Sequence, residues 1–490
     1  MPKYTALREV QTALRSGATS CRAVVEHYLS RIEETQHLNA YIETWADEAL
    51  AKADALDARF RENPASVGRL FGAVISLKDN ICYAGHRVTA ASRILEGFTS
   101  LYSATAVERL LAEDAILIGR TNCDQFGMGS SNENSVYGPV RNALDPERVP
   151  GGSSGGAAVS VQTDTCLAAL GSDTGGSVRQ PAAFCGIWGF KPTYARISRH
   201  GLIAYGSSFD QIGVLAHNPQ DIATLLEIMQ GPDEFDSTVD DGQGMEDSGQ
   251  ETVDDGRWAA KAKIAYFPET VENEGLESGV RVITQDFIKK LHAAGYTVEA
   301  VSFDPVPSPN GGGGAGLLDY VIPAYYVLTT AEASSNLARY DGIRYGYRSP
   351  HARNLEETYL LSRTEGFSEE VKRRILLGTF VLSSGYYDAY YGKAQQVRAI
   401  LRQRVLAIFE EYDFILMPVA PTVAWRFGEK SDDPVAMYLS DIFTVLANLA
   451  GVPALAMPAG VHPENGLPVG VQFMAAPRAD EKLLSFVAGL

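Results

Sequence analysis

Three separate segments of the sequence carry the residue types needed for nucleophilic attack on a carbonyl group. Lys78 follows the apolar run 72–77, Ser153 lies in the Gly/Ser turn 151–156, and Ser177 ends the second turn 171–177. A serine hydroxyl is a weak nucleophile and needs a base. A lysine can be that base, because burial disfavours its charged form and lowers its pKa.

The glycines before Ser177 supply a second requirement of acyl transfer. Gly175 and Gly176 allow consecutive backbone N–H groups to converge on one point. Such groups stabilise the oxyanion that forms when a hydroxyl attacks a carbonyl. Neither a Ser–His–Asp spacing nor a Gly-x-Ser-x-Gly elbow surrounds Ser177, which leaves a Ser–Lys arrangement with Lys78 as the base.

Each segment also has a plainer interpretation when it is taken alone. A lysine that ends an apolar run is often a surface residue with only its stem buried. The turn 151–156 lacks the Gly-Lys-Ser/Thr of a phosphate-binding loop, and a glycine turn can simply let two backbones approach closely. The combination, rather than any one segment, favours acyl transfer.

The elements that must hold these residues indicate an α/β protein. Apolar runs predict buried strands at 72–77, 115–119, 166–170, 414–418, 453–459 and 468–474. Helical spacing predicts helices at 7–14, 20–32, 47–60, 105–114, 157–161 and, as one long helix, 369–412. Apolar strands that alternate with helices are typical of a sheet covered on both faces.

The charge of the chain disfavours one class of function, nucleic-acid binding, and is concentrated in one stretch of the sequence. The 490 residues are 45% hydrophobic and carry a net charge of −18, which disfavours direct binding of nucleic acid by the surface as a whole. Ten acidic residues and no basic one lie in 233–256, so we expect this stretch, like the glycine-rich loop 310–316, to be a surface insertion. We expect the acidic stretch to be mobile and to pack on nothing, because it cannot bury enough apolar surface.

The remaining composition argues against a metal site and a membrane segment. The five cysteines form no Cys-x-x-Cys pair and the eight histidines form no His-Glu-x-x-His, so we expect free thiols and no metal. No apolar run reaches the length of a membrane span, and the N-terminus lacks the core of a signal peptide. We therefore expect a cytoplasmic protein.

Taken together, the three segments make the sequence resemble the amidase signature family. The match continues through 178–183 and 185–193 and extends over nearly the whole chain. The resemblance implies the amidase signature fold, a large mixed β-sheet with helices on both faces. It implies an N-terminal helical segment over 1–65 and an amidase signature domain over 66–490.

Three further stretches, 128–135, 371–391 and 437–453, resemble the branch of that family that forms the A subunits of tRNA-dependent amidotransferases. This resemblance implies that glutamine is hydrolysed and that the ammonia amidates Glu-tRNA(Gln), or Asp-tRNA(Asn), on a partner B subunit. It implies that ATP, Mg²⁺ and most of the mischarged tRNA are bound by the B subunit, that a small C subunit wraps the A–B contact, and that this chain carries no cofactor.

The resemblance also implies a role for each matching residue. Ser177 would be the nucleophile, with Lys78 as the base acting through Ser153, whose peptide bond is cis in this family. Asp441 would hold the α-ammonium of glutamine and Arg374 its α-carboxylate, while Tyr325 would lie beside the amide end. The oxyanion-hole N–H groups would come from Thr174, Gly175, Gly176 and Ser177.

Two alternatives remain open. A stand-alone amidase acting on small-molecule amides would need Ser177 but neither charged partner of an amino acid, so Asp441 and Arg374 argue against it. A non-catalytic scaffold with the same fold would need none of Lys78, Ser153 and Ser177. That all three are present argues against the scaffold.

Overall fold

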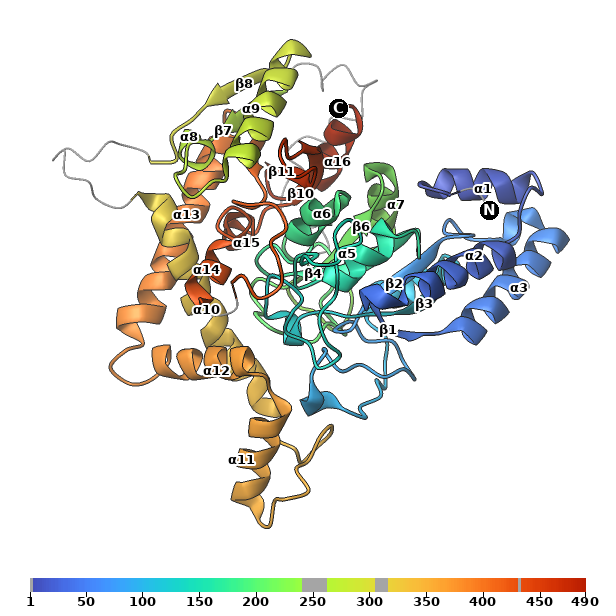
Figure 1. The fold of residues 1–490 in the computed structure, drawn as a ribbon, viewed down its shortest axis with the longest axis horizontal. Helices are drawn as coiled ribbons and strands as arrows, with labels where there is room; N and C mark the ends of the chain where they lie inside the picture. Colours follow the sequence, from blue (N-terminus) through green and yellow to red (C-terminus); the bar gives the residue numbers. More distant parts are fainter. Residues whose placement is uncertain (1–2, 240–261, 305–315, 431–432) are drawn as a thin grey trace.

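The computed structural model describes residues 3–239, 262–304, 316–430 and 433–490 (Figure 1). Within these ranges, eleven strands form one mixed sheet in the order β1-β3-β2-β4-β6-β5-β10-β11-β9-β7-β8. The strands are β1 (Tyr41–Thr44), β2 (Val74–Lys78), β3 (Ile116–Thr121), β4 (Ala168–Asp173), β5 (Trp188–Lys191), β6 (Gln211–Ala216), β7 (Lys263–Tyr266), β8 (Thr297–Ala300), β9 (Phe414–Pro418), β10 (Ala454–Val461) and β11 (Pro468–Ala475).

Helices surround this sheet along its whole length (Figure 1). They are α1 (Leu7–Arg15), α2 (Cys21–Glu34), α3 (Ala46–Glu62), α4 (Thr105–Ala112), α5 (Gly155–Gln162), α6 (Arg179–Cys185), α7 (Pro219–Met229), α8 (Pro268–Val271), α9 (Ser278–Ala293), α10 (Val321–Asn336), α11 (Leu355–Gly366), α12 (Glu369–Val381), α13 (Lys393–Phe409), α14 (Pro434–Leu439), α15 (Val445–Ala450) and α16 (Asp480–Ala488). The mixed sheet with its helices confirms the predicted fold class.

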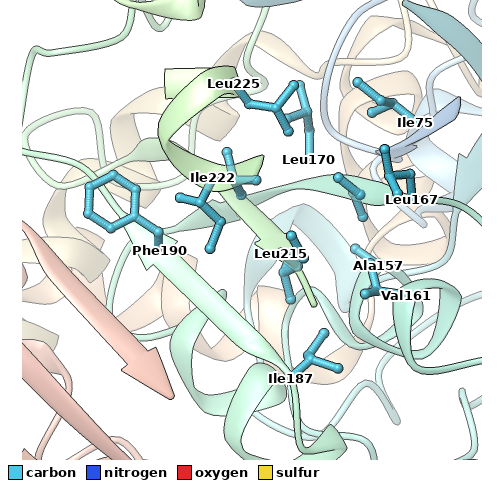
Figure 2. Packing of buried hydrophobic residues seen from close by; sticks show 14 of the residues in the cluster. Ile75, Ala157, Val161, Leu167, Leu170, Ile187, Phe190, Leu215, Ile222 and Leu225 are labelled. Atoms are coloured by element: carbon cyan, nitrogen blue, oxygen red, sulfur yellow. The ribbon is translucent and has the colours of Figure 1, made fainter. Parts of the chain in front are cut away.

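The central strands are buried on both faces, as their unbroken apolar runs predict. Every residue of β2, β3, β4, β6, β9 and β11 is buried. Figure 2 shows side chains of α5, β4, β6 and α7 packed in one cluster, with Val161, Leu170, Leu215 and Ile222 among them. An alternating pattern is absent from these strands because neither face meets water.

The N-terminal segment is helical, as predicted, with one addition. The helix α2 begins where the Ser20 hydroxyl accepts a hydrogen bond from the N–H of Ala23. The sequence did not predict β1, which pairs antiparallel with β3 and so adds an edge strand to the sheet. Four residues give too short a pattern to separate a strand from a loop.

Parallel pairing brings the segments that carry the predicted site residues to the carboxyl ends of neighbouring strands. The strand β2 pairs in parallel with both β3 and β4, so the carboxyl ends of the three strands lie side by side. Lys78 is the last residue of β2 and Asp173 the last of β4. Residues beyond the carboxyl ends of parallel strands are where open α/β sheets place their ligands.

The predicted long helix over 369–412 is wrong. The chain leaves the helical path after α12, and a π-helix (Asp388–Gly392) precedes α13. Gly385, with φ of +89°, lies in the intervening turn and takes a backbone conformation that few other residues adopt. The apolar periodicity on either side of the turn concealed this break.

The expectation that 233–256 packs on nothing is wrong for the part that the structure describes, 233–239. The Asp236 carboxylate is buried and pairs with Arg199 at 2.7 Å, and Asp233 accepts a hydrogen bond from the Thr105 hydroxyl at 2.5 Å. The Phe235 ring stacks on His200. Individual polar pairs anchor this start of the acidic stretch, which its overall charge could not reveal.

The rest of the acidic stretch, and all of 310–316 except Gly316, lie outside the described residues. The division at residue 65 stays a prediction. No helix within the described ranges is long and apolar enough to cross a membrane. All five cysteines are buried and unpaired, which confirms the predicted free thiols.

Candidate active site

Lys78 lies at the centre of a buried cluster of hydroxyl groups. Its side chain is fully buried, and Nζ donates to the hydroxyl oxygens of Ser153 at 2.7 Å, Ser154 at 2.9 Å and Ser172 at 2.9 Å. Burial lowers the pKa of Lys78 to about 8. The amine can therefore reach its neutral, proton-accepting form near neutral pH.

The structure brings Ser153 and Ser177 to the same cluster. The peptide bond between Gly152 and Ser153 is cis. The N–H of Ser154 donates to the carbonyl of Ser177 at 3.1 Å, so the residue after Ser153 contacts the predicted nucleophile directly. Ser177 is buried and lies two residues before α6 begins. Lys78, Ser153 and Ser177 thus share one site, as predicted.

The turn that carries Ser177 can present backbone N–H groups, but one of the four predicted donors is already in use. The N–H of Gly176 donates to Asp173 Oδ1 at 2.9 Å. An oxyanion hole here would therefore rest on the N–H groups of Thr174, Gly175 and Ser177. The Thr174 side chain is held by Asp210 at 2.6 Å.

Tyr325 lies against this turn. A Cβ added at Gly175 would collide with the Tyr325 hydroxyl, so only glycine lets the tyrosine of α10 approach so closely. Burial raises the pKa of Tyr325 well above its usual value, which keeps the hydroxyl protonated and able to donate. Tyr325 therefore lies against the turn that carries Ser177, and its contact with the amide end of a substrate stays a prediction.

A buried ion pair anchors the turn that carries Ser177, between β4 and α6. Asp173 and Arg179 are fully buried and pair at 3.0 Å. Burial alone would raise the pKa of Asp173, but the Arg179 guanidinium outweighs it and holds the pKa at about 2. Arg179 also donates to the Gln472 side chain at 2.7 Å and to the Asn448 side chain at 2.7 Å. Every charge in this network is paired, which is how a buried ion pair becomes tolerable.

Asp441 is a second buried carboxylate, and it is only half satisfied. Oδ2 accepts a hydrogen bond from the Ser130 hydroxyl at 2.5 Å, whereas Oδ1 is buried with no hydrogen-bond partner among the described residues. Burial raises the pKa of Asp441 to about 7. An unpaired buried carboxylate oxygen is costly, and an ammonium group bound beside it would remove that cost.

Arg374 is buried beneath a cage of aromatic rings. The rings of Tyr205, Tyr326 and Tyr438 lie 5.3–5.5 Å from its guanidinium carbon. Nε donates to Glu370 at 2.7 Å and Nη1 to the Tyr205 hydroxyl at 2.7 Å. A substrate carboxylate would therefore share Nη1 or bind Nη2, because Glu370 occupies the Nε side.

Several residues of the site carried signals that sequence reasoning did not use. Glu370 precedes Arg374 by four residues, the spacing at which charges pair on a helix. Ser130 and Asp173 lie inside stretches that carry the family resemblance, yet nothing in their type assigns them a role. Their roles depend on partners far away in the sequence, as with Ser130 and Asp441.

The described residues hold no group of three or more His, Cys, Asp or Glu side chains placed to bind a metal ion. The polar groups that can face a substrate are instead lysine, serine and backbone N–H groups, together with the buried Asp441 carboxylate and the buried Arg374 guanidinium. This set can carry out acyl transfer on a substrate that bears both an amide and a zwitterionic end.

Comparison with known proteins agrees with this chemistry. A family model described as Amidase matches residues 23–484. The A subunit of the glutamyl-tRNA(Gln) amidotransferase of Chlorobium phaeobacteroides is 47% identical over 487 residues, which cover 99% of this chain and 98% of that protein. The corresponding protein of Chlorobaculum tepidum is also 47% identical, over 100% of this chain and 98% of that protein.

A solved structure shows the same likeness in three dimensions. The crystal structure of the glutamyl-tRNA(Gln) amidotransferase A subunit from Thermotoga maritima superimposes with a TM-score of 0.74 and 36% sequence identity. The match covers 95% of this chain and 90% of that chain. The overall fold of this chain therefore has a counterpart in a solved protein of related sequence.

Proposed function

The chain belongs to the amidase family, and on that premise we propose that it is the glutamine-hydrolysing subunit of a tRNA-dependent amidotransferase. The observation that carries this proposal is the pair of neighbouring buried charges, Asp441 and Arg374. Asp441 lies near the turn that carries Ser177, because the Thr444 hydroxyl contacts the carbonyl groups of both Asp441 and Gly175. A simple amide offers nothing to pair with either charge. Glutamine offers an ammonium for Asp441 and a carboxylate for Arg374.

The reaction follows from the groups present. The Ser177 hydroxyl attacks the side-chain amide carbon of glutamine, and its proton passes to Ser153 while the Ser153 proton passes to neutral Lys78. The N–H groups of Thr174, Gly175 and Ser177 stabilise the oxyanion. As the C–N bond breaks, the leaving nitrogen takes the proton back from Lys78 through Ser153 and departs as ammonia, which leaves Lys78 neutral again.

The second half of the cycle restores the enzyme. Water attacks the γ-glutamyl ester on Ser177, the Ser153–Lys78 pair accepts its proton, and glutamate leaves with the serine hydroxyl regenerated. The burial of the site limits the access of bulk water to this ester before ammonia has left. Ser177 is 8% exposed.

The ammonia is used by a partner. We propose that a B subunit binds ATP, Mg²⁺ and the mischarged tRNA and amidates its glutamyl or aspartyl group, and that a small C subunit joins the complex. The relatives named above are subunits of glutamyl-tRNA(Gln) amidotransferases, which supports this assignment. The net charge of −18 agrees with a chain that leaves most of the tRNA contact to its partner. Such a complex works in the cytoplasm, and this chain needs no cofactor of its own.

The test separates the two half-reactions. In the assembled complex, Ser177→Ala should abolish glutamine-dependent amidation of the tRNA and leave ammonium-dependent amidation intact, because only the first needs this site. Loss of both reactions together would contradict this division of labour. Hydrolysis of fatty or aryl amides in preference to glutamine by the wild-type chain would favour the stand-alone amidase.

A further inference from the structure

We infer that Gln180 is a positioning residue that holds the amino-acid subsite and the Ser153 turn in a fixed relation to the nucleophile. The inference rests on the proposed function, since it takes glutamine as the substrate that the subsite recognises. Gln180 lies in α6, three residues after Ser177, and its side chain is fully buried.

The side-chain amide of Gln180 uses both of its ends. Its Oε1 accepts a hydrogen bond from the N–H of Gly152 at 2.9 Å, and its Nε2 donates to the carbonyl of Ser130 at 2.9 Å. A backbone N–H can only donate and a backbone carbonyl can only accept, so the orientation of the amide is determined by its partners. Neither a carboxylate nor an apolar side chain can make both bonds at neutral pH.

The two partners lead to different parts of the reaction. Gly152 precedes Ser153, whose hydroxyl accepts the hydrogen bond of Lys78. Ser130 donates through its hydroxyl to Asp441, the residue proposed to hold the substrate ammonium. One amide therefore joins the proton relay to the pocket that recognises the amino-acid end of glutamine.

The surroundings leave the turn and the loop little freedom to move apart. A Cβ added at Gly151 would lie 2.6 Å from Gln180 Oε1. Asp124 makes a second connection, because its N–H donates to the Ser153 carbonyl at 3.2 Å while its carboxylate accepts the N–H groups of Asn132 at 2.9 Å and Asn134 at 3.0 Å. A displacement of the 130–134 loop is thus transmitted to the Ser153 turn.

The two bonds of Gln180 predict two separable effects. Loss of the bond to Ser130 should disturb Asp441 and so weaken the binding of glutamine, with little effect on a substrate that has no ammonium. Loss of the bond to Gly152 should disturb Ser153 and so slow the acylation of Ser177 by any substrate. A residue that merely supports the fold would affect all substrates alike.

The experiment compares Gln180→Glu and Gln180→Met with the wild-type complex on two substrates, glutamine and p-nitrophenyl acetate. Gln180→Glu keeps the acceptor for Gly152 but, once ionised, lacks the donor for Ser130. We expect its KM for glutamine to rise roughly 5- to 150-fold, the effect of one unsatisfied buried carbonyl, with ester hydrolysis near the wild-type rate. The rise in KM should shrink at lower pH, where a protonated glutamic acid donates again.

Gln180→Met removes both hydrogen bonds and keeps a side chain of similar volume. We expect it to slow ester hydrolysis by a similar roughly 5- to 150-fold factor and to lower kcat/KM for glutamine further. Gln162→Met is the matched control, because Gln162 makes the same kind of bonds, to Ala143, Asn142 and Cys185, away from the serines. This control should keep the wild-type ratio of glutamine to ester activity.

Equal losses on both substrates in Gln180→Glu, or the same change of ratio in Gln162→Met, would overturn the inference. Wild-type kinetics in both Gln180 variants would overturn it too. If Gln180→Met does not fold, the KM shift and pH dependence of Gln180→Glu carry the test. Failure of the proposed function is distinguishable, because the wild-type complex would then hydrolyse the ester but not glutamine.

Discussion

Replacing Asp441 with asparagine should separate recognition of glutamine from catalysis on it. Asparagine keeps the size of the side chain and an oxygen that can accept the hydrogen bond of Ser130, and removes only the charge. Leaving the substrate ammonium without its buried partner costs roughly 2–5 kcal/mol. We therefore expect kcat/KM for glutamine to fall by about 30-fold or more, since 1.4 kcal/mol corresponds to tenfold.

The assay is steady-state hydrolysis of glutamine and of p-nitrophenyl acetate by the assembled complex, over a range of pH. Burial raises the pKa of Asp441 to about 7, so in the wild type kcat/KM for glutamine should rise with pH through that value as the carboxylate ionises. In Asp441→Asn the rise centred near pH 7 should disappear, and only the rise through about 8 that comes from Lys78 should remain. The ester has no ammonium, so its hydrolysis should change little.

Stability provides an internal check on this variant. Because the folded-state pKa of Asp441 lies above the ordinary value of 3.8, ionising it costs stability as pH rises from about 4 to about 7. Asparagine avoids that cost, so at pH 8 the melting temperature of Asp441→Asn should not fall. Asp480→Asn is the matched control, because Asp480 is a buried carboxylate on α16 that binds Thr193 instead of substrate. Equal losses on glutamine and the ester in Asp441→Asn would refute the assignment.

The remaining predictions concern the base, the acidic stretch, the guanidinium and the complex. Lys78→Met should lower the acylation rate by roughly 10²- to 10⁴-fold on both substrates. In the wild type this rate should rise with pH through about 8, because Lys78 loses its proton there. An acylation rate that does not depend on pH would contradict the role of Lys78 as the base. Replacing 240–256 with a short Gly-Ser linker should leave the melting temperature within a few degrees of the wild-type value. Asp236→Ala should lower the melting temperature by several degrees, because Arg199 loses its buried partner. A larger drop for the linker variant than for Asp236→Ala in thermal denaturation would contradict this. Arg374→Lys should raise KM for glutamine, because the lysine ammonium cannot replace a planar guanidinium that already binds Glu370 and Tyr205. An unchanged KM would argue against a contact between Arg374 and the substrate carboxylate. Partner subunits with charged tRNA should raise the glutaminase rate of the isolated chain by roughly 5- to 150-fold, and a chain already at full rate alone would favour a stand-alone amidase.

The sequence predicted the parts of this protein that depend on local pattern. Unbroken apolar runs marked the buried strands that end in Lys78 and run into Asp173, because a strand covered on both faces needs no polar position. The same reasoning gave no strand at β1, β5, β6, β7 or β8, and it merged α12 with α13. A four-residue edge strand and a single glycine turn leave too little signal against the pattern on either side.

The residues proposed for catalysis could be singled out because they lie in glycine- and serine-rich motifs that also carry the family resemblance, whereas the residues that contact them could not. Ser130 and Gln180 are ordinary polar residues whose roles depend on Asp441 and Gly152, which only the fold brings close. Likewise, the bond between Gly176 and Asp173 removes one predicted oxyanion donor, and this depends on side-chain geometry that spacing does not specify.

The most direct test of the account is to identify the covalent intermediate. Rapid acid quenching of the complex during glutamine turnover, followed by proteolysis and mass spectrometry, should find a γ-glutamyl group on the peptide that contains Ser177. The adduct should be absent in Ser177→Ala and after incubation with glutamate alone. A γ-glutamyl group on any other residue, or glutamine turnover that persists in Ser177→Ala, would contradict the central claim that Ser177 is the nucleophile of a glutaminase.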